Sequence, residues 1–248
     1  MDDLLDLTSR VEATHFWFRG FHRFVAPEIG AIAAGRRDLR LLDCGCGTGH
    51  NLTSLLRPHG RAFGFDLTPG GLLHARKAGF PLARADMTRI PFQSSQFDIV
   101  TSFDVLQYVQ DDLGALREMT RVLKPGGGLV MTAAALHVLR GGHAGTWPER
   151  RRYTTGDIRR LAEGAGLKVR RLTYLFASLF PAMVAVRALR RGEGHSVAAD
   201  PSADWEMQIP PAPINAALTL MLSGEAALSR YVPMPAGSSV LIVATKPV

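Results

Sequence analysis

The segment from Asp43 to Gly49 reads Asp-Cys-Gly-Cys-Gly-Thr-Gly, an acid followed by three alternating glycines. Glycine adopts positive φ angles without a Cβ clash and lets a ligand lie directly on the backbone. An apolar run precedes the segment, so we expect a buried strand that turns through the glycines into a helix. The start of such a helix presents free N–H groups and a positive dipole end to a ligand. The segment is therefore expected to bind a cofactor.

Three kinds of glycine turn compete for this spacing. A dinucleotide-binding turn requires Gly-x-Gly-x-x-Gly, and the spacing here is one residue shorter. A phosphate-binding P-loop requires Gly-Lys followed by Ser or Thr, which the segment lacks. The third interpretation is an ordinary glycine turn of an α/β protein. Asp66, which ends the expected second strand, favours a bound ribose because an acid there accepts hydrogen bonds from the ribose hydroxyls. Asp66 alone does not choose between cofactors.

Residues 43–49 closely resemble motif I of the class I S-adenosylmethionine-dependent methyltransferases. The Asp86-Met87 pair matches the family position where an acid accepts from the adenine amino group and the next N–H addresses the ring. Residues 96–106 resemble the family's Phe-Asp-x-Val…Leu-x-His motif, and residues 121–130 match its Arg-Val-Leu-Lys-Pro-Gly-Gly turn. The resemblance implies that S-adenosylmethionine binds at Asp43, Gly45, Gly47, Gly49, Asp66, Leu67, Asp86, Met87, Phe103 and Arg19.

Arg19 lies in the aromatic N-terminal run His-Phe-Trp-Phe-Arg-Gly at residues 15–20. One interpretation is a helix that caps the sheet with its aromatic side chains in the core. The run also resembles the start of a bacterial subgroup of these methyltransferases, in which this helix closes over the methionine end of the cofactor. That resemblance implies a charge-assisted contact between Arg19 and the cofactor carboxylate, a contact that arginine suits.

The sequence offers several candidates for a catalytic base. The family motif ends in a histidine where this chain has Tyr108, so no base is carried over from it. An oxygen or nitrogen acceptor needs a proton removed, and histidine is the usual group at neutral pH. His137 and His143 follow the fifth strand, on the side where ligands bind in this fold. We predict these two as catalytic candidates, with His15 and His22 as alternatives.

Strand and helix signals alternate across residues 40–175, which predicts an α/β fold with a parallel sheet. The resemblance implies a Rossmann-like, doubly wound, seven-stranded sheet that is mostly parallel, with one antiparallel strand between the fifth and sixth. We expect a single domain with four parts, namely an N-terminal helical cap (1–38), a cofactor-binding core (39–175), a helical insertion or lid (176–238) and a closing strand (239–248).

Composition excludes some classes of function. The 248 residues are 46% hydrophobic, enough for one sizeable core. The net charge is +7, but only four of the 29 basic residues are lysines and most arginines are scattered in pairs. One dense cluster, Arg150 to Arg152, comes without an RNA-binding module or an aromatic stacking platform, so nucleic acid is not an expected partner.

The two cysteines, Cys44 and Cys46, are too close together for a disulfide, and no second ligand pair accompanies them. We therefore predict no metal site. The acidic start without a signal-peptide core and the reduced cysteines predict a cytoplasmic location.

The most apolar stretch, residues 175–189, is too short and too interrupted to span a bilayer. We predict an apolar helix here, either a lid packed on the sheet edge or on a second copy in a homodimer, or a wall for a lipid-like acceptor. Arg187, Arg190 and Arg191 give this helix a basic rim. Such a rim suits an acidic acceptor or a peripheral contact with an anionic membrane.

The sequence thus predicts methyl transfer from S-adenosylmethionine to a small-molecule or lipid-like acceptor, with the acceptor atom (oxygen, nitrogen or carbon) left open. The first alternative is a non-catalytic methyltransferase-like scaffold or membrane-surface module, which Tyr108 allows. The second is a nicotinamide-dependent oxidoreductase, against which the short glycine spacing weighs.

Overall fold

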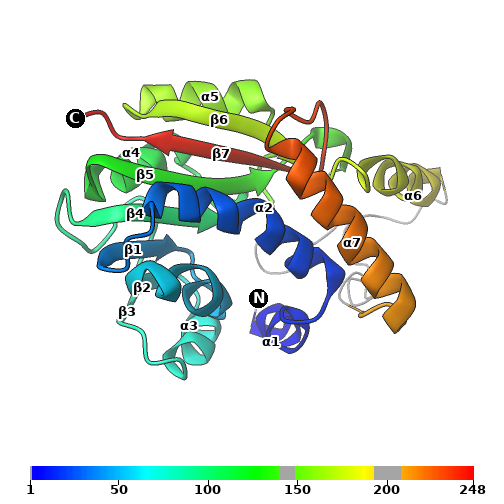
Figure 1. The fold of residues 1–248 in the computed structure, drawn as a ribbon, viewed down its shortest axis with the longest axis horizontal. Coiled ribbons are helices and arrows are strands. Elements are labelled where there is room, and N and C mark those ends of the chain that lie inside the picture. The colour runs from blue at the N-terminus through cyan, green and yellow to red at the C-terminus, as the bar shows by residue number, and fades with distance from the viewer. Residues whose placement is uncertain (1, 140–148, 193–207) are drawn as a thin grey trace.

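The computed structural model describes residues 2–139, 149–192 and 208–248. Its centre is a seven-stranded sheet in the order β3-β2-β1-β4-β5-β7-β6 (Figure 1). The strands are β1 (Leu39–Cys44), β2 (Gly60–Asp66), β3 (Leu82–Arg84), β4 (Phe97–Phe103), β5 (Leu123–Ala134), β6 (Lys168–Leu175) and β7 (Ser239–Thr245). Strands β1 to β5 pair in parallel, whereas β7 runs antiparallel to both β5 and β6. The predicted doubly wound sheet with an antiparallel closing strand is confirmed.

The described helices are α1 (Asp2–Val11), α2 (Phe16–Ala33), α3 (Pro69–Arg76), α4 (Asp112–Val122), α5 (Thr155–Gly164), α6 (Phe180–Gly192) and α7 (Ala212–Ser229). A π-helical turn at Leu52–Leu56 follows the glycine turn, and shorter helical turns lie at Arg57–His59, Leu106–Tyr108 and His137–Leu139. Helices α1 and α2 both lie within residues 1–38, for which the sequence predicts a helical cap.

Apolar clusters hold helices on both faces of the sheet. One cluster joins Leu42 of β1 to Leu116 of α4 and Ile158 of α5. The other joins Leu41 of the same strand to α2 and to Leu222 of α7. Successive strand residues point to opposite faces, so a strand covered on both sides is apolar throughout. Figure 1 shows α2 across the front of the sheet, with α7 packed against it.

The predicted helix over residues 175–189 is wrong at its start. Strand β6 continues to Leu175, and α6 begins only at Phe180. Between them Phe176 has a positive φ of 61° and is fully buried. The next two N–H groups, of Ala177 and Ser178, donate to the Glu225 carboxylate of α7 at 2.7 and 2.9 Å. A contact about 50 residues away along the chain therefore turns the backbone here, which local hydrophobicity does not reveal.

Among the described residues, none of the helices combines the length and hydrophobicity needed to cross a lipid bilayer.

Candidate functional site

A cavity of about 610 Å³ lies at the carboxyl ends of β1 to β4, the edge where ligands bind in open α/β sheets. Its volume is typical of small-molecule sites, which span about 300–1,000 Å³. The predicted cofactor residues that line it are Gly45, Gly47, Asp66, Leu67, Asp86, Met87 and Phe103. The other three, Asp43, Gly49 and Arg19, lie outside its lining.

The glycine turn depends on left-handed backbone geometry. The φ angles of Gly45, Gly47 and Gly49 are 80°, 49° and 82°, values that side chains with a Cβ rarely adopt. The N–H groups of Gly45 and Cys46 both donate to the Phe65 carbonyl, at 2.9 and 3.0 Å. These two bonds tie the turn to the end of β2.

The glycines differ in what their missing side chains permit. A Cβ on Gly45 would lie 2.5 Å from Cγ2 of Val105, at the cavity wall. A Cβ on Gly49 would lie 2.8 Å from the Cβ of Ala75 in α3. Gly45 therefore lets the Val105 side chain of the cavity wall pack against the turn, while Gly49 lets α3 pack closely against it.

Asp66 connects the turn to the cavity. Its Oδ2 accepts the Gly47 N–H at 2.9 Å. Its Oδ1 accepts both the N–H and the hydroxyl of Thr68, at 2.8 and 2.6 Å. A carboxylate has about four acceptor sites, so Asp66 braces the turn and retains acceptor capacity toward the cavity.

Asp86 repeats this arrangement after β3. Its Oδ1 accepts the N–H and the hydroxyl of Thr88, both at 2.7 Å. Met87 beside it is 5% exposed and lines the cavity together with Leu67. The cavity thus has an acid and an apolar side chain after each of β2 and β3, a pairing that suits a ribose and a flat apolar ring.

Asp43 supports the turn from beneath. It is 1% exposed, and its Oδ1 accepts the Thr101 hydroxyl at 2.7 Å. The pKa of Asp43 is raised to about 7. Burial is the main cause, the nearby Asp66 charge acts in the same direction, and the Thr101 hydrogen bond partly opposes both. Asp43 is thus placed to position the glycine turn from below the cavity.

Helix α2 presents aromatic rings to the cavity through Trp17, Phe18 and Phe21. Arg19 is exposed on the opposite side of the helix. Residues are about 100° apart around a helix, so position 19 points away from a face centred between positions 17, 18 and 21. The structure therefore does not bring Arg19 to the cavity.

Glu12, the residue directly after helix α1, makes contacts with the glycine turn that the sequence did not suggest. The Thr48 hydroxyl donates to both oxygens of Glu12, at 3.1 and 2.8 Å. His50 Nδ1 lies 3.9 Å from the same carboxylate, and its ring stacks on His22 with centroids 5.1 Å apart. Burial raises the pKa of Glu12 and lowers the pKa of both histidines. The signal available in the sequence was the histidine next to the last glycine of the turn, at position 50.

None of the candidate histidines that the structure describes lines the cavity. His15 is 3% exposed and caps α2, because its Nδ1 accepts the Trp17 N–H at 3.2 Å. His22 lies outside the lining, and its Nε2 pairs at 3.2 Å with Oδ1 of Asn51, which lines the cavity. His137 is exposed and also outside the lining. His143 lies outside the described residues.

Tyr108 occupies the wall where the family motif places a histidine. Burial raises the pKa of its phenol, so the group is neutral at pH 7 and offers an O–H donor. Asp104, at the end of β4, also lines the cavity, and its carboxyl accepts the Thr132 hydroxyl at 3.2 Å. Burial raises the pKa of Asp104 to about 6.

Within the described part of the chain, no three His, Cys, Asp or Glu side chains are arranged to hold a metal ion. Cys44 and Cys46 are free and buried, and burial raises the pKa of both thiols.

Comparison with known proteins identifies the family. A model of the methyltransferase domain matches residues 42–131. The malonyl-[acyl-carrier protein] O-methyltransferase of Dechloromonas aromatica is 32% identical over 186 residues, which cover 66% of this chain and 69% of that protein. The chain therefore belongs to the class I S-adenosylmethionine-dependent methyltransferases, a family whose cofactor is S-adenosylmethionine.

Other relatives match a smaller part. The malonyl-[acyl-carrier protein] O-methyltransferase of Herminiimonas arsenicoxydans is 34% identical over 136 residues, covering 53% of this chain and 52% of that protein. The ubiquinone biosynthesis O-methyltransferase of Aeromonas salmonicida is 30% identical, covering 53% of this chain and 63% of that protein. The chain thus spans about half to two thirds of the length of these curated relatives.

Solved structures share the fold at low identity. An S-adenosylmethionine-dependent methyltransferase from Mesorhizobium loti superposes with a TM-score of 0.55 at 20% identity, covering 89% of this chain and 96% of that one. The [4+2]-cyclase SpnF superposes with a TM-score of 0.57 at 19% identity, covering 91% and 82%. One fold hosts both a methyltransferase and a cyclase, so activity has to be argued from the site.

Proposed function

We propose that this protein transfers a methyl group from S-adenosylmethionine to an oxygen of a small-molecule acceptor with an apolar body. The observation that carries the proposal is the Asp66 carboxylate, which holds the Gly47 N–H at the wall of the 610 Å³ cavity. The three reported relatives named as O-methyltransferases support an oxygen acceptor. The aromatic wall formed by Trp17, Phe18 and Phe21 supports an apolar one.

The residues present suit this cofactor. The glycine turn packs closely against Val105 of the cavity wall, which a Cβ on Gly45 would displace. Asp66 would hold the ribose hydroxyls, and Asp86 would accept from the adenine amino group beside Met87. Asp43 and Gly49 would act indirectly, by fixing the turn from beneath and by allowing α3 to approach it.

S-adenosylmethionine, when bound, supplies an activated methyl group. The protein has to orient the acceptor and exclude water, and positioning alone contributes several kcal/mol to such reactions. The aromatic side chains of α2 would exclude water. Tyr108, a neutral phenol, would donate a hydrogen bond to the acceptor rather than remove its proton.

Calorimetry with S-adenosylhomocysteine tests the cofactor site. We expect Asp66→Asn to weaken binding by about 1.5–3 kcal/mol, the range for hydrogen bonds to charged groups. Asp38→Asn, at an exposed acid, is the matched control and should leave affinity unchanged. Unchanged affinity in a folded Asp66→Asn protein would overturn the assignment.

A second measurement separates the enzyme from a non-catalytic scaffold. Tritiated methyl transfer from S-adenosylmethionine should label pools of acyl thioesters, hydroxylated aromatics or quinols. Cofactor binding without labelling of any pool would favour the scaffold, and binding of a nicotinamide nucleotide in place of S-adenosylhomocysteine would favour the oxidoreductase.

Helix α7 suggests a second role, because its polar and apolar faces are inverted. Asn215, Thr219 and Glu225 are buried, and Asn215 Oδ1 accepts the Phe16 N–H at 2.8 Å. The outer face instead carries exposed apolar side chains, namely Ile214, Leu220, Met221 and Leu228, and the exposed Tyr231 and Val232 follow the helix. An exposed apolar face of this kind usually marks a contact surface.

We propose that this outer face of α7 contacts an anionic membrane surface, which the net charge of +7 supports. The wild type should float with vesicles containing phosphatidylglycerol and less with phosphatidylcholine alone. Leu220→Gln combined with Leu228→Gln should abolish flotation, whereas Leu73→Gln on α3 should not. A doubled mass by light scattering that the α7 variants halve would show a homodimer instead. We also propose a cytoplasmic location, which the free thiols support and cell fractionation tests.

A further inference from the structure

The three arginines at residues 150–152 differ in their bonding partners. Arg151 Nη1 lies 2.7 Å from Asp112 Oδ2, and its Nη2 donates to the Gln110 carbonyl at 3.0 Å. Arg152 Nε lies 2.8 Å from Glu149 Oε2, in a pair whose side chains are only 10% and 12% exposed. Both charges are therefore balanced by carboxylates of the protein.

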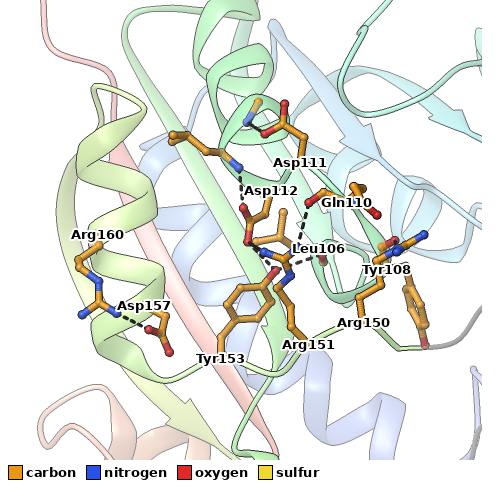
Figure 2. Close-up of polar contacts among 12 residues, drawn as sticks. Leu106, Tyr108, Gln110, Asp111, Asp112, Arg150, Arg151, Tyr153, Asp157 and Arg160 are labelled. Carbon is orange, nitrogen blue, oxygen red and sulfur yellow. Dashed lines mark hydrogen bonds and ion pairs between the residues drawn. The ribbon is translucent and has the colours of Figure 1, made fainter.

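Arg150 differs from its two neighbours. Among the described residues, it forms no ion pair, and it lines the cavity. Its backbone N–H donates to the Gln107 carbonyl at 2.9 Å, and its Nε donates to the Tyr108 carbonyl at 3.2 Å. Figure 2 shows the Arg150 guanidinium beside Tyr108, away from the Arg151–Asp112 pair.

The segment that carries Arg150 is anchored by Tyr153. The Tyr153 hydroxyl lies 3.2 Å from Asp112 Oδ2 and 3.3 Å from the Leu106 carbonyl, so it fastens residues 150–153 to the loop after β4 (Figure 2). With Nε committed to a carbonyl, the two terminal nitrogens of Arg150 have donors left for a ligand. A planar pair of donors of this kind matches a carboxylate.

One of the acids in the cavity lining is already engaged by the protein. Asp111 also lines the cavity, but its Oδ1 accepts the Gly114 N–H at 2.8 Å and caps the start of α4. A carboxylate in that position is stabilised by the positive end of the helix dipole.

The position of Arg150 separates it from the cofactor residues. Asp66 and Asp86 follow β2 and β3, whereas Arg150 is bonded to the loop that follows β4. The lining also includes the apolar side chains of Phe103, at the end of β4, and Val109, in the loop after it. Arg150 therefore lies on the half of the cavity left for an acceptor.

We propose that Arg150 binds a carboxylate carried by an acceptor with an apolar body. The inference rests on the proposed function for the identity of the other ligand, but it concerns a separate part of the cavity. Arg151 and Arg152, by contrast, serve the structure of the loop.

Octanoate and 1-octanol are matched probes, because they share an apolar chain and differ in the anionic group. We measure both by calorimetry, with and without saturating S-adenosylhomocysteine. The wild type should bind octanoate more tightly than octanol. Arg150→Gln should weaken octanoate about 10- to 100-fold, as expected for loss of a charge-assisted pair, and leave octanol unchanged. Arg150→Lys should retain part of the preference.

Arg117→Gln, at an exposed arginine outside the cavity lining, makes the same change in net charge and should alter neither affinity. Equal affinities of the wild type for the two probes, or no octanoate binding, would overturn the proposal. So would an Arg150→Gln protein that loses S-adenosylhomocysteine and octanoate in parallel, since Arg150 would then belong to the cofactor site. Failure of the wild type to bind S-adenosylhomocysteine would instead contradict the proposed function, while the octanoate preference could still be measured alone.

Discussion

The Thr48 hydroxyl donates to the Glu12 carboxylate at 2.8 Å, joining helix α1 to the glycine turn. Glu12 has only 13% of its side chain exposed. Nδ1 of His50 lies 3.9 Å from the same carboxylate, and the charge of His74 also acts on it. The largely buried Glu12 carboxylate, directly after α1, thus links the end of this helix to Thr48 of the glycine turn.

Thr48→Val should loosen α1. The substitution leaves a buried carboxylate without its donor, a change that costs about 1–3 kcal/mol. We expect lower stability in urea and faster hydrogen exchange over residues 2–11. Thr48→Ser, which keeps the hydroxyl, is the control and should behave like the wild type. Exchange in α1 that is the same in both variants would mean that the hydrogen bond does not hold the helix.

Gly45→Ala should abolish cofactor binding in a protein that still folds. Gly45 and Gly35 both have a φ of 80°, so alanine is strained to a similar degree at either position. Only Gly45 has a close neighbour, with a Cβ that would lie 2.5 Å from Val105, whereas nothing lies within 4 Å at Gly35. Gly35→Ala should therefore lose stability but keep affinity for S-adenosylhomocysteine. Equal affinities in the two variants would remove the turn from the cofactor site.

Asp43 should make stability depend on pH. Its folded pKa of about 7 lies above the ordinary value of 3.8 because the carboxyl is buried. The unfolded chain then releases its proton first as pH rises, so the stabilisation present below about pH 4 is lost progressively up to pH 7. The slope reaches about 1.4 kcal/mol per pH unit for one proton.

Urea denaturation of the wild type and Asp43→Asn between pH 4.5 and 6.5 measures this effect. Loss of the ionisable group should remove that part of the slope, so the variant should gain stability relative to the wild type as pH rises. Asp104, whose pKa burial raises to about 6, contributes equally in both proteins and cancels. Parallel pH profiles would show that Asp43 titrates normally.

Phe176 should act through stability, because it lies behind the cavity wall. It is fully buried, and its ring stacks on Trp17 with centroids 3.8 Å apart and an interplanar angle of 9°. Phe176→Ala should cost about 3–5 kcal/mol, as for other buried phenylalanines. Phe18→Ala, at a partly exposed ring that lines the cavity, should cost less stability and weaken 1-octanol more. Denaturation and calorimetry on the pair distinguish a core residue from a wall residue; the reverse ranking would contradict the structure.

The sequence by itself determined the parts that depend on neighbouring residues. Asp43 to Gly49 predicted a strand, a left-handed turn and a helix, since glycine adopts positive φ angles more readily than any other residue. Asp66 and Asp86 were found because each follows an apolar strand. Parallel strands bring their carboxyl ends to one edge of the sheet, so local patterns were enough to bring these acids together.

Tertiary structure alone decided the contacts between distant segments. Glu225 turns the chain at Phe176, and Thr48 pairs with Glu12, which lies 36 residues earlier in the chain. Arg150 stands apart from two identical neighbours only because Asp112 and Glu149 neutralise those neighbours. Arg19 was assigned to the cofactor by resemblance, but the rotation of α2 about its axis, set by packing, points it outward. Such pairings depend on three-dimensional packing between segments, which the spacing of residues along the chain does not encode.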